Sequence, residues 1–139
     1  MELTTAQRIR MYIEDEERDA IIYKQLSNMA TSTKAREILF ELTSDEQAHS
    51  DSFKKIYHAI TGRNYTPLVI PPELNGTFKD VIINQILEEA DSFRKYEEQY
   101  QLNTKNKLFR DAYFRAKTDE QVHANKLIYI LLYELINKN

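Results

Sequence analysis

The sequence predicts an all-α protein built as a four-helix bundle, and three observations lead to this fold class. Both glycines and all three prolines lie within residues 62–76, so the two flanking stretches lack the residues that interrupt helices. Apolar residues in those stretches recur at spacings of three and four, as on the buried side of a helix. The two stretches also resemble each other, with matching residues 73 or 74 positions apart. The chain therefore divides into two similar helical halves joined by a linker.

Composition and charge are those of an ordinary globular domain. The 139 residues are 42% hydrophobic and 29% charged, and the net charge of -3 excludes a broad basic face for nucleic acid. The absence of cysteine excludes disulfides, iron–sulfur clusters and thiolate metal sites. The longest apolar run, residues 127–133, is far shorter than the roughly 20 residues that span a bilayer. With no secretory signal visible at the N-terminus, we expect a cytoplasmic protein without nucleic-acid or membrane partners.

Polar breaks divide each half into two helices. The patterns Thr4-x-x-Gln7 and Thr77-x-x-Asp80 have the spacing of capping boxes, which mark helix starts. The polar stretches 31–33 and 103–104 interrupt the two halves with residue types that cap a following helix. We predict helices over about 4–30, 34–61, 77–102 and 105–136 in a single domain, 1–139. Their predicted core faces carry, for example, Ile13, Phe53, Ile60, Ile82 and Tyr113.

The length of the linker, residues 62–76, predicts how the halves are joined. Fully extended at ~3.3 Å per residue it spans ~45–50 Å, which matches a helix of about 30 residues at ~1.5 Å per residue. We therefore expect two helical hairpins joined by one long crossover that makes the second and third helices parallel. The apolar run Leu68-Val69-Ile70 is expected to pack the crossover onto the bundle, and a dimer interface through the same run is the alternative.

Six ionisable side chains interrupt the otherwise apolar helix faces: Glu16, Glu46, His49, Glu89, Glu120 and His123. Buried carboxylates without partners cost on the order of several kcal/mol each, and two divalent cations would balance four carboxylates. Glu46 and His49 are three residues apart and project from one helix face, and the second half repeats this spacing. The sequence therefore predicts a two-metal site in the core. Oxygen and nitrogen ligands suit iron, manganese or zinc without choosing among them.

One ligand of the first helix has an alternative. Glu17 follows Glu16 directly and would replace it if the helix were rotated. The other acidic residues near the ligand positions, Glu14, Glu88 and Glu97, are expected at the surface. His58 lies about half a turn off the ligand face and is expected there too.

The ligand pattern resembles that of the ferritin-like di-iron carboxylate superfamily, which has one glutamate on each of two helices and Glu-x-x-His on each of the other two. The chain looks closest to rubrerythrin-type domains and bacterioferritins, and the resemblance covers almost its whole length. It implies that Glu16 and His49 bind one metal ion and that Glu89 and His123 bind the other. Glu46 and Glu120 would bridge the two ions, and the resemblance favours iron.

The resemblance also assigns supporting roles to four further residues. Asp45 would hydrogen-bond to His123, and Asp119 to His49, each across the two hairpins. Tyr23 and Tyr96 would donate hydrogen bonds to the terminal glutamates across the bundle. The alternatives are simple core packing for the tyrosines and exposed charges for the aspartates.

As to activity, the resemblance implies an oxidoreductase that reduces H2O2 or O2 at a di-iron centre. Rubrerythrins usually add a rubredoxin domain with four cysteines and an extra glutamate where Ser92 stands here, and ferritins often add a fifth helix used in cage assembly. This sequence has none of these features, so we expect a homodimer that takes its electrons from an external donor or from Fe(II). The alternatives are a ferroxidase for iron handling and a metal-binding bundle without turnover.

Overall fold

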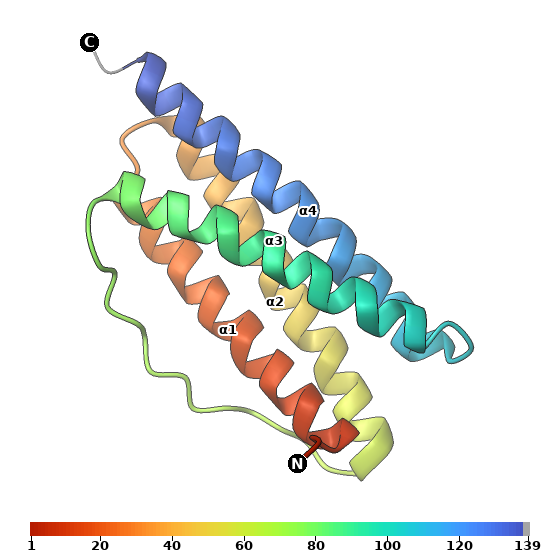
Figure 1. Ribbon diagram of the computed structural model, residues 1–139. Coiled ribbons are helices and arrows are strands. Elements are labelled where there is room, and N and C mark those ends of the chain that lie inside the picture. The colour runs from red at the N-terminus through yellow and green to blue at the C-terminus, as the bar shows by residue number, and fades with distance from the viewer. Residues whose placement is uncertain (138–139) are drawn as a thin grey trace.

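The computed structural model describes residues 1–137, which form four α-helices (Figure 1). Helix α1 spans Thr5–Met29, α2 spans Thr33–Thr61, α3 spans Phe78–Leu102 and α4 spans Lys107–Ile136. No strand occurs among these residues, so the predicted all-α four-helix bundle is confirmed. None of the helices in the described part of the chain has the length and apolar character needed to cross a lipid bilayer.

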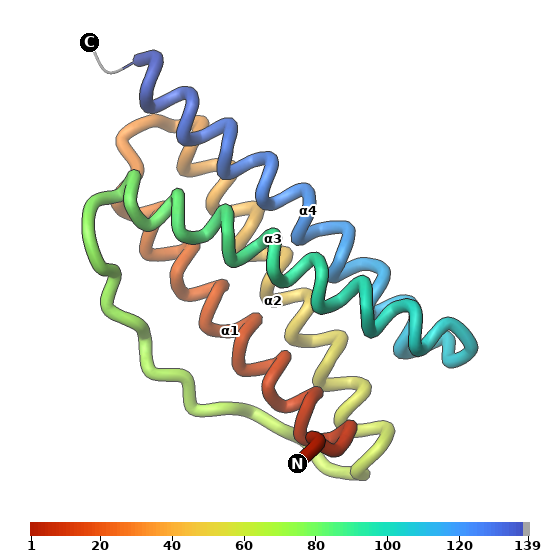
Figure 2. The backbone as a smooth tube through the Cα atoms, in the orientation of Figure 1, coloured from red at the N-terminus to blue at the C-terminus, as the bar shows by residue number. Residues whose placement is uncertain are grey.

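Neighbouring helices pair as antiparallel hairpins, α1 with α2 and α3 with α4 (Figure 1). The segment between the hairpins, residues 62–77, runs along α1 from its N-terminal end to its C-terminal end (Figure 2). Near the start of this segment Tyr65 donates a hydrogen bond to Glu14, and near its end the Pro72 carbonyl accepts one from Gln25 at 3.4 Å. Helices α2 and α3 therefore run in the same direction.

The apolar run in this segment does not pack as a unit. The side chains of Leu68 and Ile70 are 96% and 81% exposed, whereas Val69 is half-buried. Successive side chains of an extended chain point to opposite sides, which fits the partial burial of the middle residue alone. The packing prediction is wrong for Leu68 and Ile70, and the dimer interface through this run stays a prediction.

Three helices begin at predicted caps, and the fourth does not. The side chains of Thr4, Ser32 and Thr77 each accept a hydrogen bond from the third residue of the helix that follows. For α4 the cap is Asn106, whose side chain accepts from the Phe109 backbone N–H at 3.3 Å. The predicted cap at 103–104 is wrong because α3 continues to residue 102, which leaves Asn103 as its C-cap and the next residues as the turn.

Two clusters of buried apolar side chains fill the ends of the bundle interior. The first includes Tyr23, Leu26, Leu39 and Leu127, and the second includes Ile13, Phe53, Tyr96 and Tyr113. On each helix, the one or two ionisable core residues lie between residues of the first cluster and residues of the second. Ile60 is 41% exposed, contrary to its predicted core position, because it lies in the last turn of α2 at the end of the bundle.

The corrected start of α4 predicts different effects for two neighbouring substitutions. Asn106→Ala should lower the free energy of unfolding by about 1 kcal/mol, because it removes the side-chain acceptor of the helix cap. Thr104→Ala should change it by less than about 0.5 kcal/mol, as expected for an exposed turn residue. Urea unfolding followed by circular dichroism measures both free energies of unfolding. A larger decrease for Thr104→Ala than for Asn106→Ala would place the helix cap at residue 104.

Candidate metal centre

The six ionisable core residues meet at one level of the bundle, and each residue is at most 1% exposed. Helices α1 and α3 contribute one glutamate each, and α2 and α4 contribute a Glu-x-x-His pair each. They form two groups in which every residue offers a ligand atom within 4.8 Å of the others. The first group is Glu16, Glu46, His49 and Glu120, and the second is Glu46, Glu89, Glu120 and His123. The structure therefore brings all six predicted residues together, and Glu46 and Glu120 belong to both groups.

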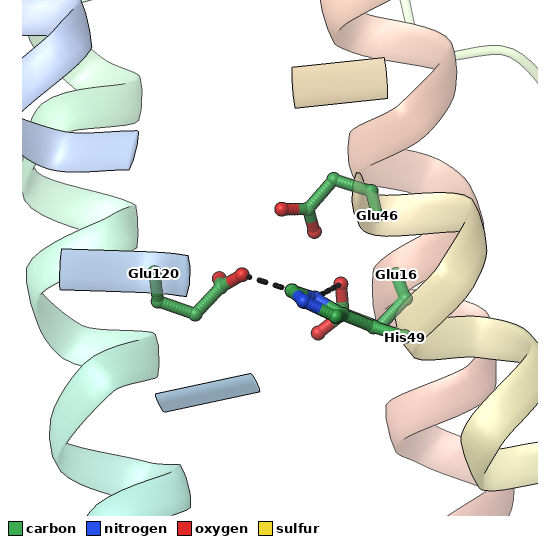
Figure 3. Close-up of side chains that lie close together, drawn as sticks. All are labelled: Glu16, Glu46, His49 and Glu120. Carbon is green, nitrogen blue, oxygen red and sulfur yellow. Dashed lines mark hydrogen bonds and ion pairs between the residues drawn. The ribbon is translucent and has the colours of Figure 1, made fainter. Parts of the chain in front are cut away.

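The first group surrounds the inner nitrogen of His49 (Figure 3). His49 Nδ1 lies 3.3 Å from Glu16 Oε2 and 3.3 Å from Glu120 Oε1. Figure 3 shows Glu16, Glu46 and His49 projecting from α1 and α2 toward Glu120, which projects from α4. The two hairpins thus contribute donor atoms to the same space.

The second group contains donor atoms that no protein partner satisfies. His123 Nδ1 lies 2.7 Å from Glu46 Oε1, but the contact lacks hydrogen-bond geometry. Six buried atoms of the two groups have no hydrogen-bond partner: Glu46 Oε1 and Oε2, Glu89 Oε2, Glu120 Oε1 and Oε2, and His123 Nδ1. Unpaired buried polar atoms are unfavourable in a protein interior. This set of oxygen and nitrogen donors therefore fits a pair of divalent cations, which would satisfy all of them.

Two aspartates orient the histidines from the opposite hairpin. His49 Nε2 lies 2.7 Å from Asp119 Oδ2, and His123 Nε2 lies 2.9 Å from Asp45 Oδ2. Both hydrogen bonds implied by the resemblance are thus present in the structure. A carboxylate at Nε2 holds the proton on that nitrogen, so Nδ1 is the nitrogen that faces the carboxylate cluster and that offers its lone pair when the imidazole is neutral. This is the arrangement that histidine needs as a metal ligand.

Two tyrosines hold the terminal glutamates from across the bundle. The Tyr23 hydroxyl of α1 donates to Glu89 Oε1 of α3, and the Tyr96 hydroxyl of α3 donates to Glu16 Oε1 of α1. Burial and then the charge of the partner glutamate raise the pKa of each tyrosine well above its ordinary value, so both stay protonated donors. Each bond occupies one oxygen of its glutamate; of the other oxygens, Glu16 Oε2 lies 3.3 Å from His49 Nδ1 and Glu89 Oε2 has no hydrogen-bond partner.

The protons of the metal-free cluster are unevenly distributed. Burial, followed by the charges of neighbouring glutamates, raises the pKa of Glu46 and of Glu120 well above the ordinary value. Burial also acts to raise the pKa of Glu16, but the neighbouring Glu46 and hydrogen bonds with His49 and Tyr96 outweigh it and lower the pKa to about 2. Without metal, protons therefore remain on the two shared glutamates.

The histidines hold protons as well. Burial acts to lower the pKa of His49, but the neighbouring carboxylates of Asp119, Glu120 and Glu16 raise it well above its ordinary value. For His123, burial is outweighed in the same way, first by the hydrogen bond with Asp45. Metal ions would have to displace these protons, so binding should weaken as the pH falls.

Two residues beside the cluster were missed in the sequence. Asp19 lies one turn after Glu16, and burial followed by the charges of Glu16 and Glu89 raises its pKa well above the ordinary value. The signal for it was the Glu-x-x-Asp spacing, which places both carboxyls on one helix face. Gln85 is 3% exposed, and its Nε2 donates to the Tyr23 hydroxyl at 3.4 Å.

The alternative ligand Glu17 is excluded by its contacts. Its carboxylate pairs with Lys54 at 2.6 Å and accepts a hydrogen bond from Ser50 at 3.1 Å, which holds it in the outer contact between α1 and α2. Glu97 pairs with Lys117 at 3.0 Å, and Glu88 and His58 are exposed, as predicted.

Comparison with known proteins gives no independent assignment. No family model, no curated protein and no solved structure matches this chain. The function is therefore argued from the arrangement of the site and from the residue pattern.

The proton distribution predicts how the metal-free protein responds to pH. A raised folded pKa means that Glu46 and Glu120 keep protons that the unfolded chain releases near pH 4.5. That stabilisation is present below the unfolded pKa and is lost as the pH rises through the folded pKa. The raised pKa values of His49 and His123 act in the same sense above the ordinary value of 6.5. The free energy of unfolding in chelator should therefore fall from about pH 5 to about pH 8.

Glu46→Gln should reduce this fall, because the amide stays neutral at every pH. The matched control is Glu88→Gln, which changes an exposed glutamate of α3. Urea unfolding in chelator across this pH range measures the free energy of unfolding of the wild type and of the two variants. A steeper fall in Glu46→Gln than in the wild type would contradict the proton assignment.

Proposed function

We propose that this chain is a di-iron carboxylate oxidoreductase of the rubrerythrin type, which reduces H2O2 or O2 at a pair of metal ions in the bundle core. The observation that carries the proposal is the doubled donor set, two buried groups that share Glu46 and Glu120. A shared pair of carboxylates suits two adjacent cations better than one. The resemblance of the Glu-x-x-His pattern to the ferritin-like superfamily supports iron as the metal and a ferritin-like fold with a long crossover.

Each residue of the cluster has a distinct role in this proposal. Glu16 and His49 would hold one ion, Glu89 and His123 the other, and Glu46 and Glu120 both. Two ferrous ions, when bound, supply two electrons, which is the number that reduction of H2O2 to water consumes. Manganese or zinc fits the same donor atoms, but zinc has no redox chemistry to offer.

The surrounding residues prepare the ligands before any ion arrives. Asp119 and Asp45 fix the proton on the outer nitrogen of each histidine, so the inner nitrogen is already aimed at the cluster and becomes a ligand once it loses its proton. Tyr96 and Tyr23 hold one oxygen of Glu16 and Glu89 in place, which leaves the second oxygen free to bind. Little reorganisation is then needed on binding, and this preorganisation favours both affinity and rapid reaction.

Access to the site is from the side of the bundle. The two apolar clusters close the interior above and below the ionisable layer. The side chains of Asp45 and Asp119, which contact the buried histidines directly, are 35% and 26% exposed. A small neutral molecule such as H2O2 would therefore reach the centre between α2 and α4. The sequence holds no cysteine-based redox centre, so the electron donor is another molecule or Fe(II) itself.

The first prediction of this proposal concerns metal binding. The purified chain should bind about two Fe(II) or Mn(II) ions, and Glu46→Ala or Glu120→Ala should abolish cooperative loading because each removes a shared ligand. A thousandfold excess of metal over its dissociation constant should stabilise the fold by about 4 kcal/mol, which raises the melting temperature by on the order of 10 °C.

Titration calorimetry and thermal melts test this, with Glu17→Ala as the control because that carboxylate pairs with Lys54 outside the cluster. Retention of two ions in Glu46→Ala, or no bound metal in the wild type after anaerobic Fe(II) loading, would remove the basis of the proposal.

The second prediction concerns the reaction. With two Fe(II) ions bound anaerobically, a pulse of H2O2 should oxidise them much faster than a pulse of O2, as followed by stopped-flow absorbance. Continued consumption of excess Fe(II) with a growing mineral absorbance would instead identify a ferroxidase. Bound iron that reacts with neither oxidant would identify a bundle without turnover.

A further inference from the structure

The two ends of the bundle interior differ although the internal repeat relates them. Around Tyr23 the buried cluster is aliphatic, whereas around Tyr96 it is aromatic, with Tyr12, Phe53, Phe109 and Tyr113. The repeat offset is 73 between α1 and α3 (Glu16 to Glu89) and 74 between α2 and α4 (Glu46 to Glu120). By these offsets Tyr12 corresponds to Gln85 and Tyr113 corresponds to Leu39. The aromatic character is therefore particular to one end.

Three tyrosine rings at this end contact one another in a closed triangle. The ring centroids are 5.2 Å apart for Tyr12 and Tyr96, 6.1 Å for Tyr12 and Tyr113, and 6.3 Å for Tyr96 and Tyr113. The Tyr96 hydroxyl donates to Glu16, so one corner of the triangle touches the candidate metal centre. Tyr12 is 5% exposed and lies beneath the ammonium of Lys95, which is 5.1 Å from its ring centroid. The triangle therefore connects the centre with the surface.

The hydroxyls of Tyr12 and Tyr113 make no hydrogen bond within the described protein and reach the solvent. Within residues 1–137, tyrosine hydroxyls form hydrogen bonds at Tyr23, Tyr65 and Tyr96, and none forms at Tyr12 or Tyr113. Neither hydroxyl is among the buried atoms that lack a hydrogen-bond partner, so both are accessible to water, whereas Phe53 and Phe109 in the same cluster carry no hydroxyl. A phenol differs from a phenyl ring chemically in how readily it gives up one electron.

We propose that Tyr96, Tyr12 and Tyr113 form a relay that carries single oxidising equivalents from the candidate metal centre to the surface near Lys95. The relay rests on the proposed redox function, because it needs an oxidant at the centre. Rings in van der Waals contact exchange electrons rapidly, so each step of the triangle is short enough for transfer. The aliphatic end around Tyr23 offers no such path among the described residues.

The relay is needed when only one ferrous ion is bound. H2O2 accepts two electrons, and a single Fe(II) supplies one of them as it becomes Fe(III). Tyr96 supplies the second electron and passes its phenolic proton to Glu16, to which it is hydrogen-bonded. With two protons from solvent, H2O2 would become two water molecules, while the phenolic proton stays on Glu16 and the unpaired electron remains on Tyr96.

The oxidising equivalent then moves outward from Tyr96 to Tyr12. Tyr12 gives an electron to Tyr96, and Tyr96 recovers its proton from Glu16. The proton of Tyr12 passes to water at the surface. The Lys95 ammonium, 4.6 Å from the Tyr96 ring centroid and also above Tyr12, disfavours a positively charged ring and so favours loss of the proton with the electron. A one-electron donor of the ascorbate class finally restores Tyr12 with one electron and one proton.

The test uses the whole chain loaded anaerobically with less than one Fe(II) ion. After a pulse of H2O2, freeze-quench electron paramagnetic resonance should show a tyrosyl radical that ascorbate removes. In the double variant Tyr12→Phe with Tyr113→Phe, the radical should remain at Tyr96 and its removal by ascorbate should be at least about tenfold slower. The control, Tyr129→Phe, changes an exposed tyrosine of α4 and should behave as the wild type. Equal rates in the wild type and the double variant overturn the relay.

Two further readouts separate the relay from the proposed function. Fe(II) oxidation is followed optically in the same samples. If Fe(II) is oxidised and no tyrosyl radical forms, the relay is overturned and the proposed function stays intact. Absence of Fe(II) oxidation by H2O2 overturns both. If the double variant fails to fold, radical trapping and peptide mass spectrometry of the wild type decide: adducts on Tyr12 or Tyr113 support the relay, and adducts on Tyr23 or Tyr129 overturn it.

Discussion

Four glutamates meet in the apolar interior of this bundle, where like charges repel strongly and water does not screen them. The hydrogen bonds that surround the cluster can be understood as responses to this repulsion. Tyr96 and His49 donate to Glu16 and hold it ionised, whereas Glu46 and Glu120 keep protons in the absence of metal. The protein thus tolerates the cluster by placing protons where cations would otherwise lie. This makes the arrangement costly as a purely structural core and well suited to a pair of metal ions.

The same hydrogen bonds determine how the two hairpins fit together. Asp119 and Asp45 reach the histidines of the opposite hairpin, and Tyr23 and Tyr96 reach the glutamates of the opposite hairpin. Neither hairpin alone contains a complete donor group, because Glu120 completes the first group and Glu46 completes the second. Docking of the hairpins and assembly of the site are therefore one event. A ligand that binds the assembled site stabilises the whole fold for the same reason.

The sequence was most informative where helical spacing of residues coincided with the internal repeat of the two halves. The ligand positions followed from helical spacing, and repetition of Glu-x-x-His separated them from surface glutamates such as Glu88. The features that the sequence did not predict depend on partners distant in the chain. Nothing local indicated that Leu68 faces solvent, and Tyr12 fell outside the predicted core face although it lies 5.2 Å from Tyr96 in the structure. Periodicity identifies a buried face, but which rings meet across helices is decided by the packing of all four helices.

The departures from the repeat carry functional meaning that the repeat itself does not. The repeat is strict at the four glutamates and two histidines, which gives both donor groups the same composition of three glutamates and one histidine. One turn away it fails: beside Tyr96 stands Tyr12, and beside Tyr23 stands Gln85, which also lines a surface pocket with Glu73, Asp80 and Asn84. The two tyrosines that hold the terminal glutamates therefore have different neighbours, a buried amide at one end and aromatic rings at the other. The repeated scaffold thus places each terminal glutamate against a tyrosine, Glu89 against Tyr23 and Glu16 against Tyr96, but surrounds these two tyrosines with side chains of different chemistry.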